Sequence, residues 1–230
     1  SCVFSTVRND HELEAAALCR EVMGDGVHVS ISSEIGSVSL LERENATILN
    51  AALVNVAKTT SESFIAALDA EGIKDAEIYL CQNDGTLMSA EYAMRYPILT
   101  IACGPTNSIR GASFLTGLKD AVVVDIGGTT TDLGVLVHGF PRESMLAVEI
   151  GGVRTNVSSA DSDVILVGGG SIVRRHEDGT VTVGPDSVGY KVTEKALCFG
   201  GDTLTATDIV VARGMAPGVG DPEKVAFLAP

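Results

Sequence analysis

Two aspartates, two glycines and three threonines lie close together in the middle of the chain, and their types and spacing suit phosphate chemistry. The segment AVVVDIGGTTTDLGVLV covers residues 121–137 and places Asp125 before the glycines and Asp132 after the threonines. Backbone N–H groups in a glycine turn can form a concave anion site. A carboxylate beside such a turn can hold a hard divalent cation directly or through water. The segment therefore predicts a site for the terminal phosphates of a nucleotide together with a metal ion.

The alternative is a β-hairpin in which the glycines only make the turn. The glycines alone would favour that hairpin, but the carboxylates and hydroxyls around them favour the phosphate interpretation. The candidate residues are the metal-binding and catalytic Asp125, the second catalytic carboxylate Asp132, and the phosphate-binding Gly127, Gly128, Thr129 and Thr130.

A second glycine run, formed by Gly168, Gly169, Gly170 and Ser171, follows a hydrophobic segment. It is a further candidate for phosphate binding through its N–H groups, or an irregular turn in which glycine supplies positive φ, and the sequence leaves both interpretations open. Asp161 and Asp163, just before it, suit either a cation or the solvated approach to a strand. Cys103 is interpreted as structural, because no histidine lies near it in the sequence to activate a thiol.

Hydrophobic periodicity and capping residues predict the elements that position these residues. Helix–strand units before the first glycine turn predict an α/β sheet, and the chain after the turn is richer in strands. A soft boundary separates residues 1–119 from 120–230 within one continuous unit. Expected helices cover 11–23, 42–57, 61–70 and 89–95, followed by a connecting helix opened by Pro105 and a last helix from Thr207 or Asp208. Expected strands cover 27–32, 77–82, 97–102, 131–138, 142–150 and 163–167, with a hairpin of 172–175 and 180–183 around Asp178-Gly179.

Composition limits the classes of function. Of the 230 residues, 45% are hydrophobic and 20% are charged, which is typical of a globular protein with an aliphatic core. The net charge of −14 argues against binding to nucleic acid and disfavours anionic membrane surfaces, since both need basic residues. No apolar run reaches roughly 18 residues, and we expect no signal peptide. The five cysteines form no CxxC pair, which favours a cytoplasmic location.

The DIGGTTTD segment resembles the second phosphate-binding loop of the actin, sugar kinase and chaperone ATPase superfamily. Residues 103–112, CGPTNSIRGA, resemble the connecting helix that precedes this loop there. More narrowly, the chain resembles the hydantoinase A / 5-oxoprolinase family. That resemblance rests on an ordered series of segments: SSEIGSVSLLERENATILNAAL (32–53), NDGTLMSAEYAMRYPILTIACGP (83–105), DIGGTTTD, VGGGSI (167–172), VGPDSVG (183–189) and TATDI (205–209).

The resemblance implies a ribonuclease H-like, actin-like ATPase fold, with a mixed sheet and flanking helices. It also implies an ATP-dependent hydrolase that uses Mg²⁺ and opens hydantoin or 5-oxoproline type cyclic amides after phosphoryl transfer from ATP. On that basis Asp125 holds Mg²⁺ through water, Gly127, Gly128 and Thr129 cradle phosphate, and Asp132 orients water or metal. The alternatives are a kinase or carboxylase subunit of the same superfamily, or a non-catalytic nucleotide-binding or assembly domain.

Two features that the superfamily resemblance implies are missing from the sequence: a first phosphate loop and an adenosine loop further downstream. No second DxGGT-like segment occurs. We therefore expect a central fragment of a longer enzyme, with little or no ATPase activity by itself. Members of the family pair with a different subunit, so a hydantoinase B-type partner is implied by analogy.

Overall fold

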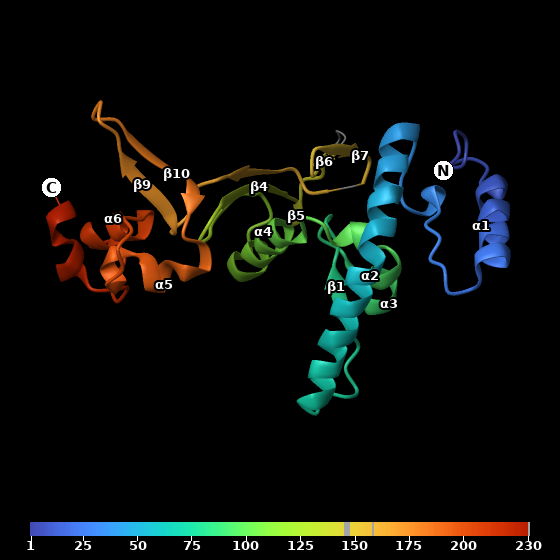
Figure 1. The fold of residues 1–230 in the computed structure, drawn as a ribbon, viewed down its shortest axis with the longest axis horizontal. Helices are drawn as coiled ribbons and strands as arrows, with labels where there is room; N and C mark the ends of the chain where they lie inside the picture. Colours follow the sequence, from blue (N-terminus) through green and yellow to red (C-terminus); the bar gives the residue numbers. More distant parts are fainter. Residues whose placement is uncertain (145–147, 158, 230) are drawn as a thin grey trace. The chain divides into compact units, whose positions relative to one another are not determined.

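The computed structural model describes residues 1–144, 148–157 and 159–229, and the chain divides into two compact units (Figure 1). Unit 1 contains Ser1–Ala121 and Leu136–Asp161, and unit 2 contains Val122–Val135 and Ser162–Pro230. The chain therefore passes from one unit to the other inside strand β3 (Ala121–Ile126), inside β4 (Thr131–Val137) and after Asp161. The division into residues 1–119 and 120–230 stays a prediction.

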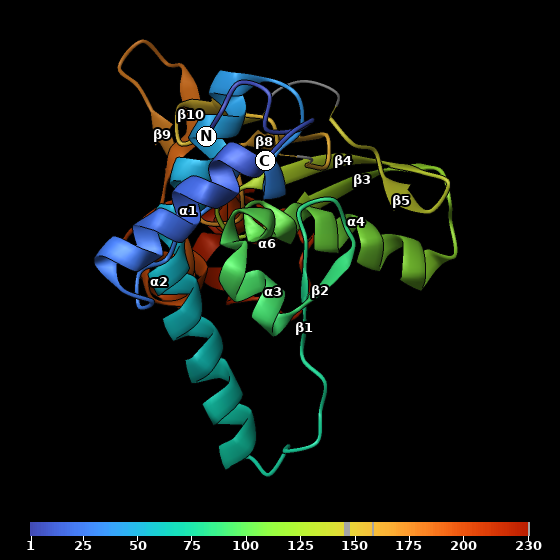
Figure 2. The same ribbon diagram turned by 90° about the vertical axis from the view of Figure 1, so that its right-hand side faces the viewer.

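Unit 1 is built around the long helix α2 (Leu40–Ala70), which contacts α3 (Ala90–Arg95), the 3₁₀ helix η2 (Pro97–Thr100) and strand β7 (Val153–Thr155). Both ribbon views show the C-terminal half of α2 running past α3 (Figures 1 and 2). The other elements of unit 1 are α1 (Asp10–Met23), η1 (Ser32–Glu34), β1 (Tyr79–Cys81), β2 (Leu87–Ser89), α4 (Cys103–Thr116), β5 (Phe140–Pro141) and β6 (Val148–Ile150).

The helices predicted in unit 1 are present, but some of their bounds differ. The connecting helix α4 begins at Cys103, two residues before the Pro105 that was expected to open it. Helix α1 ends before Gly24, which has a φ of 90°, and Ser89 caps α3 by accepting a hydrogen bond from the Tyr92 N–H at 3.2 Å. The two helices expected over 42–57 and 61–70 are one continuous helix, α2, because no glycine or proline interrupts it.

Two predicted strands of unit 1 are wrong. Residues 27–31 belong to no strand of the described structure, and η1 follows them directly. Residues 97–100 form η2, because the ring of Pro97 fixes a φ that suits the first turn of a helix. Asn50 of α2 holds this turn in place, since its Oδ1 accepts a hydrogen bond from the Ile98 N–H at 3.2 Å. The core beside it contains Ala46, Ile98 and Val157, which are buried.

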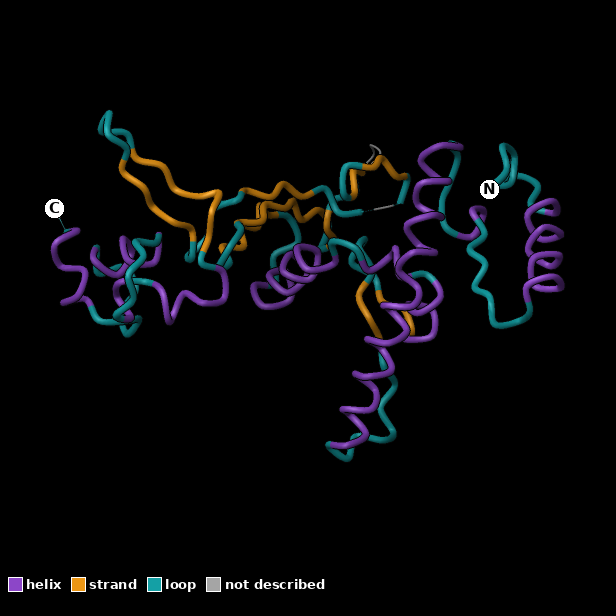
Figure 3. Tube along the Cα trace, viewed as in Figure 1, coloured by secondary structure: helices purple, strands orange, loops and turns teal. Residues whose placement is uncertain are grey.

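Unit 2 contains the candidate site and a small helical core. Strand β4 pairs antiparallel with β8 (Ser162–Ile165), with Thr131 opposite Ile165. Strands β9 (Ser171–Arg175) and β10 (Val181–Ser187) form an antiparallel hairpin, which confirms the prediction there and is visible in Figure 3. The core residues are Ala196, Cys198, Val211 and Val225. The short helices are η3 (Gly189–Lys191), α5 (Val192–Lys195), η4 (Leu197–Phe199), α6 (Ala206–Ala212) and η5 (Pro222–Leu228).

The last predicted helix is present as α6, one residue earlier than expected. Thr205 is its N-cap, and the carboxylate of Asp208 accepts hydrogen bonds from the Thr205 N–H at 2.7 Å and the Thr205 hydroxyl at 2.9 Å. Asp208 therefore closes a capping box. The strand predicted over 142–150 is seen only as β6, and its residues 145–147 lie outside the described residues. Among the described residues, no helix is both long enough and apolar enough to cross a membrane.

Candidate phosphate and metal site

The first glycine turn is an exposed connection between β3 and β4. The Gly127 N–H donates to the Thr130 carbonyl oxygen at 2.8 Å and closes the turn. Gly127, Gly128 and Thr129 are exposed. The N–H groups of Gly128 and Thr129 have no acceptor among the residues that the structure describes. Two adjacent donors at an exposed turn are the arrangement that an anion needs.

The second glycine run donates backbone hydrogen bonds to this turn. The Gly169 N–H donates to the Gly127 carbonyl at 3.0 Å, and the Gly170 N–H donates to the Gly128 carbonyl at 2.6 Å. Thr131 adds a third link, since its hydroxyl donates to the Val167 carbonyl at 2.7 Å. These bonds tie the turn to a loop that lies about forty residues further along the chain, and they occupy the carbonyl groups of Gly127 and Gly128.

The N–H groups of the second run are thereby already occupied. Besides the Gly169 and Gly170 bonds, the Gly168 N–H donates to Ser171 Oγ at 2.9 Å and the Ser171 N–H donates to the Gly168 carbonyl at 3.0 Å. Ser171 itself is fully buried. The structure gives these four residues a supporting role toward the first turn, and their direct contact with phosphate stays a prediction.

Asp125 and Asp132 flank the turn on β3 and β4, and both are half-buried. Burial raises the pKa of the Asp132 carboxyl, and the neighbouring charge of Asp125 raises it further. The two carboxylates therefore interact through space, and a cation between them would remove the repulsion. No cluster of three or more His, Cys, Asp or Glu side chains with metal-binding geometry occurs among the described residues. Mg²⁺ fits such a partial donor set, because it commonly takes one or two carboxylates and completes its shell with phosphate oxygens and water.

The other residues singled out from the sequence have different surroundings. Asp161 accepts a hydrogen bond from Arg142 Nε at 2.9 Å. Asp163 lies opposite Leu133 in the β4–β8 ladder. Burial raises the pKa of the Cys103 thiol and the nearby Cys81 raises it further, which keeps the thiol protonated and agrees with a structural cysteine.

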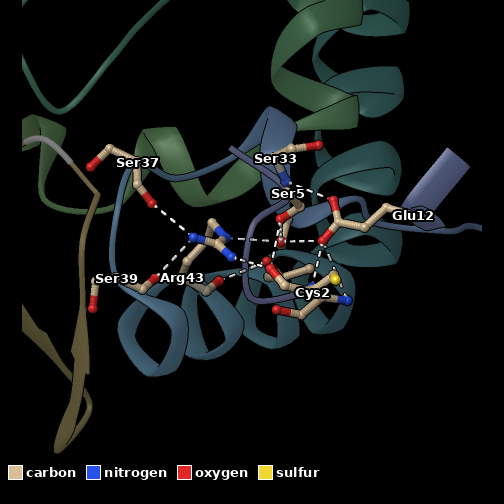
Figure 4. Close-up of polar contacts among 10 residues, drawn as sticks. Cys2, Ser5, Glu12, Ser33, Ser37, Ser39 and Arg43 are labelled. Carbon is tan, nitrogen blue, oxygen red and sulfur yellow. Dashed lines mark hydrogen bonds and ion pairs between the residues drawn. The ribbon is translucent and has the colours of Figure 1, made fainter. Parts of the chain in front are cut away.

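A buried polar network in unit 1 carries a residue to which the sequence assigned no role. Arg43 of α2 is 1% exposed. Its guanidinium donates to Ser32 Oγ at 3.0 Å and to the carbonyl oxygens of Ser37 at 3.1 Å, Ser39 at 3.2 Å and Cys2 at 2.5 Å (Figure 4). Arg43 therefore fixes the loop between η1 and α2. The local pattern ERENAT does not indicate a buried charge, because it suits a solvated helix start equally well.

Glu12 of α1 extends the same network. Its carboxylate accepts hydrogen bonds from the Ser32 hydroxyl at 2.5 Å and the Ser33 N–H at 3.0 Å (Figure 4). Burial acts to raise the pKa of Glu12, but the hydrogen bonds from Ser32 and Ser33 outweigh it and lower the pKa from 4.5 to about 2.

We expect this network to make the protein sensitive to acid. Because the folded-state pKa of Glu12 lies below its unfolded value of 4.5, its stabilisation is complete above about pH 4.5 and is lost as the pH falls toward 2. The full contribution is about 3 kcal/mol by linkage. Urea unfolding should show that Glu12→Gln is destabilised relative to the unchanged chain at neutral pH, and that about 2 kcal/mol of this difference disappears near pH 3.

Glu14→Gln, at an exposed position on the same helix, is the matched control and should behave like the unchanged chain at both pH values. A Glu12→Gln variant whose deficit does not change with pH would contradict the assignment.

Comparison with solved structures gives the fold class. The crystal structure of ATP-dependent caprolactamase from Pseudomonas jessenii matches 98% of this chain and 34% of that chain, with a TM-score of 0.75 and 24% identity. A nucleotide-free structure of acetone carboxylase matches 99% of this chain and 34% of that chain, with a TM-score of 0.66 and 22% identity. These likenesses confirm the expected α/β fold class.

The chain belongs to the hydantoinase/oxoprolinase family, whose model matches residues 43–216. Among curated proteins it is 26% identical to caprolactamase subunit alpha of Pseudomonas jessenii, over 93% of this chain and 31% of that protein. It is 29% identical to 5-oxoprolinase 1 of Arabidopsis thaliana, over 89% of this chain and 16% of that protein. It is also 26% identical to the acetophenone carboxylase gamma subunit of Aromatoleum aromaticum, over 93% of this chain and 30% of that protein. The chain thus spans about a third or less of the length of these relatives.

Proposed function

We propose that the chain provides the phosphate and metal side of an ATP site in an enzyme that opens hydantoin or 5-oxoproline type cyclic amides. The observation that carries the proposal is the exposed turn at 127–130, with free N–H groups and a carboxylate on each flanking strand. Membership of the hydantoinase/oxoprolinase family supports it, as do relatives named 5-oxoprolinase and caprolactamase.

Each residue of the turn has a distinct part in this proposal. Gly128 and Thr129 would donate their N–H groups to phosphate oxygens. Gly127 and Thr130 close the turn through the hydrogen bond from the Gly127 N–H to the Thr130 carbonyl. Asp125 holds Mg²⁺ through water, and Asp132 orients water or the metal. ATP bound there with Mg²⁺ would transfer its γ-phosphoryl group to the amide oxygen and leave as ADP, and water would then open the activated ring with release of phosphate. The chain contributes position and charge, which are the main protein contributions to phosphoryl transfer.

A carboxylase subunit is the second candidate, because the acetophenone carboxylase gamma subunit matches as much of the chain as the caprolactamase subunit does. Relatives named as alpha, beta and gamma subunits also support a further, hydantoinase B-type partner. Product analysis with the whole enzyme separates the candidates. A ring-opened amino acid supports the amidohydrolase, and incorporation of labelled bicarbonate supports the carboxylase.

The phosphate site is tested by calorimetric titration of Mg²⁺-ATP. We expect Asp125→Ala to weaken binding at least about tenfold, which corresponds to about 1.4 kcal/mol. Glu177→Ala is the matched control, since it removes one negative charge from an exposed position of the same unit. Equal affinity of the Asp125→Ala variant and the control would contradict the proposal. If the chain alone binds no nucleotide, the same pair of variants in the whole polypeptide decides the question.

A further inference from the structure

The two free N–H groups of the first glycine turn belong to peptide groups whose carbonyls are hydrogen-bonded. The Thr129 N–H shares a peptide group with the Gly128 carbonyl, which accepts from the Gly170 N–H at 2.6 Å. The Gly128 N–H shares one with the Gly127 carbonyl, which accepts from the Gly169 N–H at 3.0 Å. Because a peptide group is conjugated, a bond accepted by its oxygen polarises its N–H and makes that N–H a stronger donor.

The series that ends at Thr129 begins at Thr207. The Gly170 N–H shares its peptide group with the Gly169 carbonyl, which accepts bonds from the Thr207 N–H at 2.9 Å and from the Thr207 hydroxyl at 2.8 Å. Hydrogen bonds therefore run from Thr207 through two peptide groups to the free Thr129 N–H. We call this series of bonds the Thr207 relay.

A second series, which we call the Ser171 relay, ends at the Gly128 N–H. The Gly169 N–H shares its peptide group with the Gly168 carbonyl, which accepts from the Ser171 N–H at 3.0 Å. Both donors in this relay are backbone N–H groups. The Thr207 relay also has a side-chain hydroxyl at its origin, which a substitution can remove without changing the backbone. The two adjacent donors of the turn therefore serve as test and control for each other.

The surroundings of Thr207 hold its hydroxyl against the Gly169 carbonyl. Thr207 is half-buried and is the second residue of α6, and first-turn N–H groups have no acceptor inside their own helix. The buried capping box of Thr205 and Asp208 fixes the start of this helix. A Cβ atom at Gly169 would lie 2.9 Å from Thr207 Oγ1, so the absence of a side chain there admits the hydroxyl.

We propose that Thr207 is a positioning residue for phosphate binding. Its hydroxyl orients the Gly169 carbonyl and, through the Thr207 relay, polarises the Thr129 N–H that donates to phosphate. The assignment of that N–H to phosphate rests on the proposed function. The protein has a net charge of −14, so an anion at the turn depends on Mg²⁺ and on the strength of the neutral N–H donors.

The first test is the NMR shift of the two amide protons in the 230-residue chain without nucleotide. Thr207→Val keeps the shape and the backbone N–H but removes the hydroxyl. We expect the Thr129 amide proton to move upfield, because its N–H is less polarised, and the Gly128 amide proton to move much less. Thr207→Ser retains a hydroxyl and should retain the original shift. An unmoved Thr129 signal, or an equal change at both residues, would overturn the inference.

The second test is calorimetric titration of Mg²⁺-ATP. We expect Thr207→Val to weaken binding roughly threefold, since only part of one neutral hydrogen bond is transmitted to the turn. Thr207→Ser should bind as the unchanged chain does, which a loss of packing would not produce. Thr193→Val makes the same change at an exposed position of α5 in the same unit and is the matched control. If Asp125→Ala weakens binding but Thr207→Val matches the control, Thr207 has no such role.

The relay can also be tested in the unchanged chain. The short bond from the Gly170 N–H to the Gly128 carbonyl should give a scalar coupling between the nitrogen and the carbonyl carbon. Absence of this coupling contradicts the relay even if Thr207→Val does not fold.

These measurements separate the inference from the proposed function, because the NMR tests need no nucleotide. A Thr129 shift that depends on Thr207, together with normal binding by Asp125→Ala, contradicts the phosphate site and leaves the relay intact. A Thr129 shift that ignores Thr207, together with weak binding by Asp125→Ala, contradicts only the relay. If the chain alone binds no nucleotide, the titrations use the same variants in the whole polypeptide.

Discussion

Replacing Gly168 with alanine is expected to lower the free energy of unfolding by about 3 kcal/mol, at the upper end of the range for overpacking. A Cβ atom at this position would lie 2.6 Å from the Gly127 carbonyl oxygen, 2.7 Å from the Thr129 nitrogen and 2.8 Å from the Gly128 carbonyl carbon. All three atoms belong to backbone, so no side chain can turn away to relieve the contact. The two glycine loops must separate, and the bonds from Gly169 and Gly170 to the first turn are strained or lost.

Urea unfolding followed by circular dichroism measures this effect. The matched control is Gly128→Ala, because a Cβ there meets nothing within 4 Å and the residue lies in the facing turn. We expect the control to change stability by less than about 1 kcal/mol. We also expect Gly168→Ala to weaken Mg²⁺-ATP binding, although Gly168 has no free N–H to offer, because the turn at 127–130 loses its support. Equal stability of the two variants would show that the loops are not packed as described.

The second large effect is expected at Arg43. We expect Arg43→Met to destabilise the chain by about 4 kcal/mol, since removing one member of a buried charged network typically costs 3–5 kcal/mol. Methionine fills most of the space but leaves the carbonyl oxygens of Cys2, Ser37 and Ser39 without donors in a buried site. Arg43→Lys keeps the charge but cannot reach all three carbonyls as a planar fork can, so an intermediate loss is expected.

Arg20→Met provides the control for this variant, because Arg20 is an exposed arginine near the end of α1. Its loss of stability in urea should stay below about 0.5 kcal/mol, as for most surface substitutions. An Arg43→Met variant as stable as Arg20→Met would contradict the network shown in Figure 4.

The sequence by itself determined the features that depend on neighbouring residues. The glycine turn between two strands, the Ser89 cap and the β9–β10 hairpin each follow from residue types within a few positions of one another. The ordered family segments also came from sequence alone, and the match of residues 43–216 to the family model confirms them.

Only the tertiary structure decided which groups are free and which are used. The Gly169 N–H looks available in sequence, but its acceptor is the Gly127 carbonyl in a different loop. Arg43 is typical of a solvated helix start, but carbonyls of the preceding loop and of Cys2 surround it. Asn83 belongs to an ordinary turn, yet backbone hydrogen bonds with Leu99, Thr106 and Ala160 fix it, and the residue is 2% exposed. Local propensity sets the backbone shape of a segment, whereas the partner of a buried N–H, charge or amide is chosen by segments that meet only when the chain has folded.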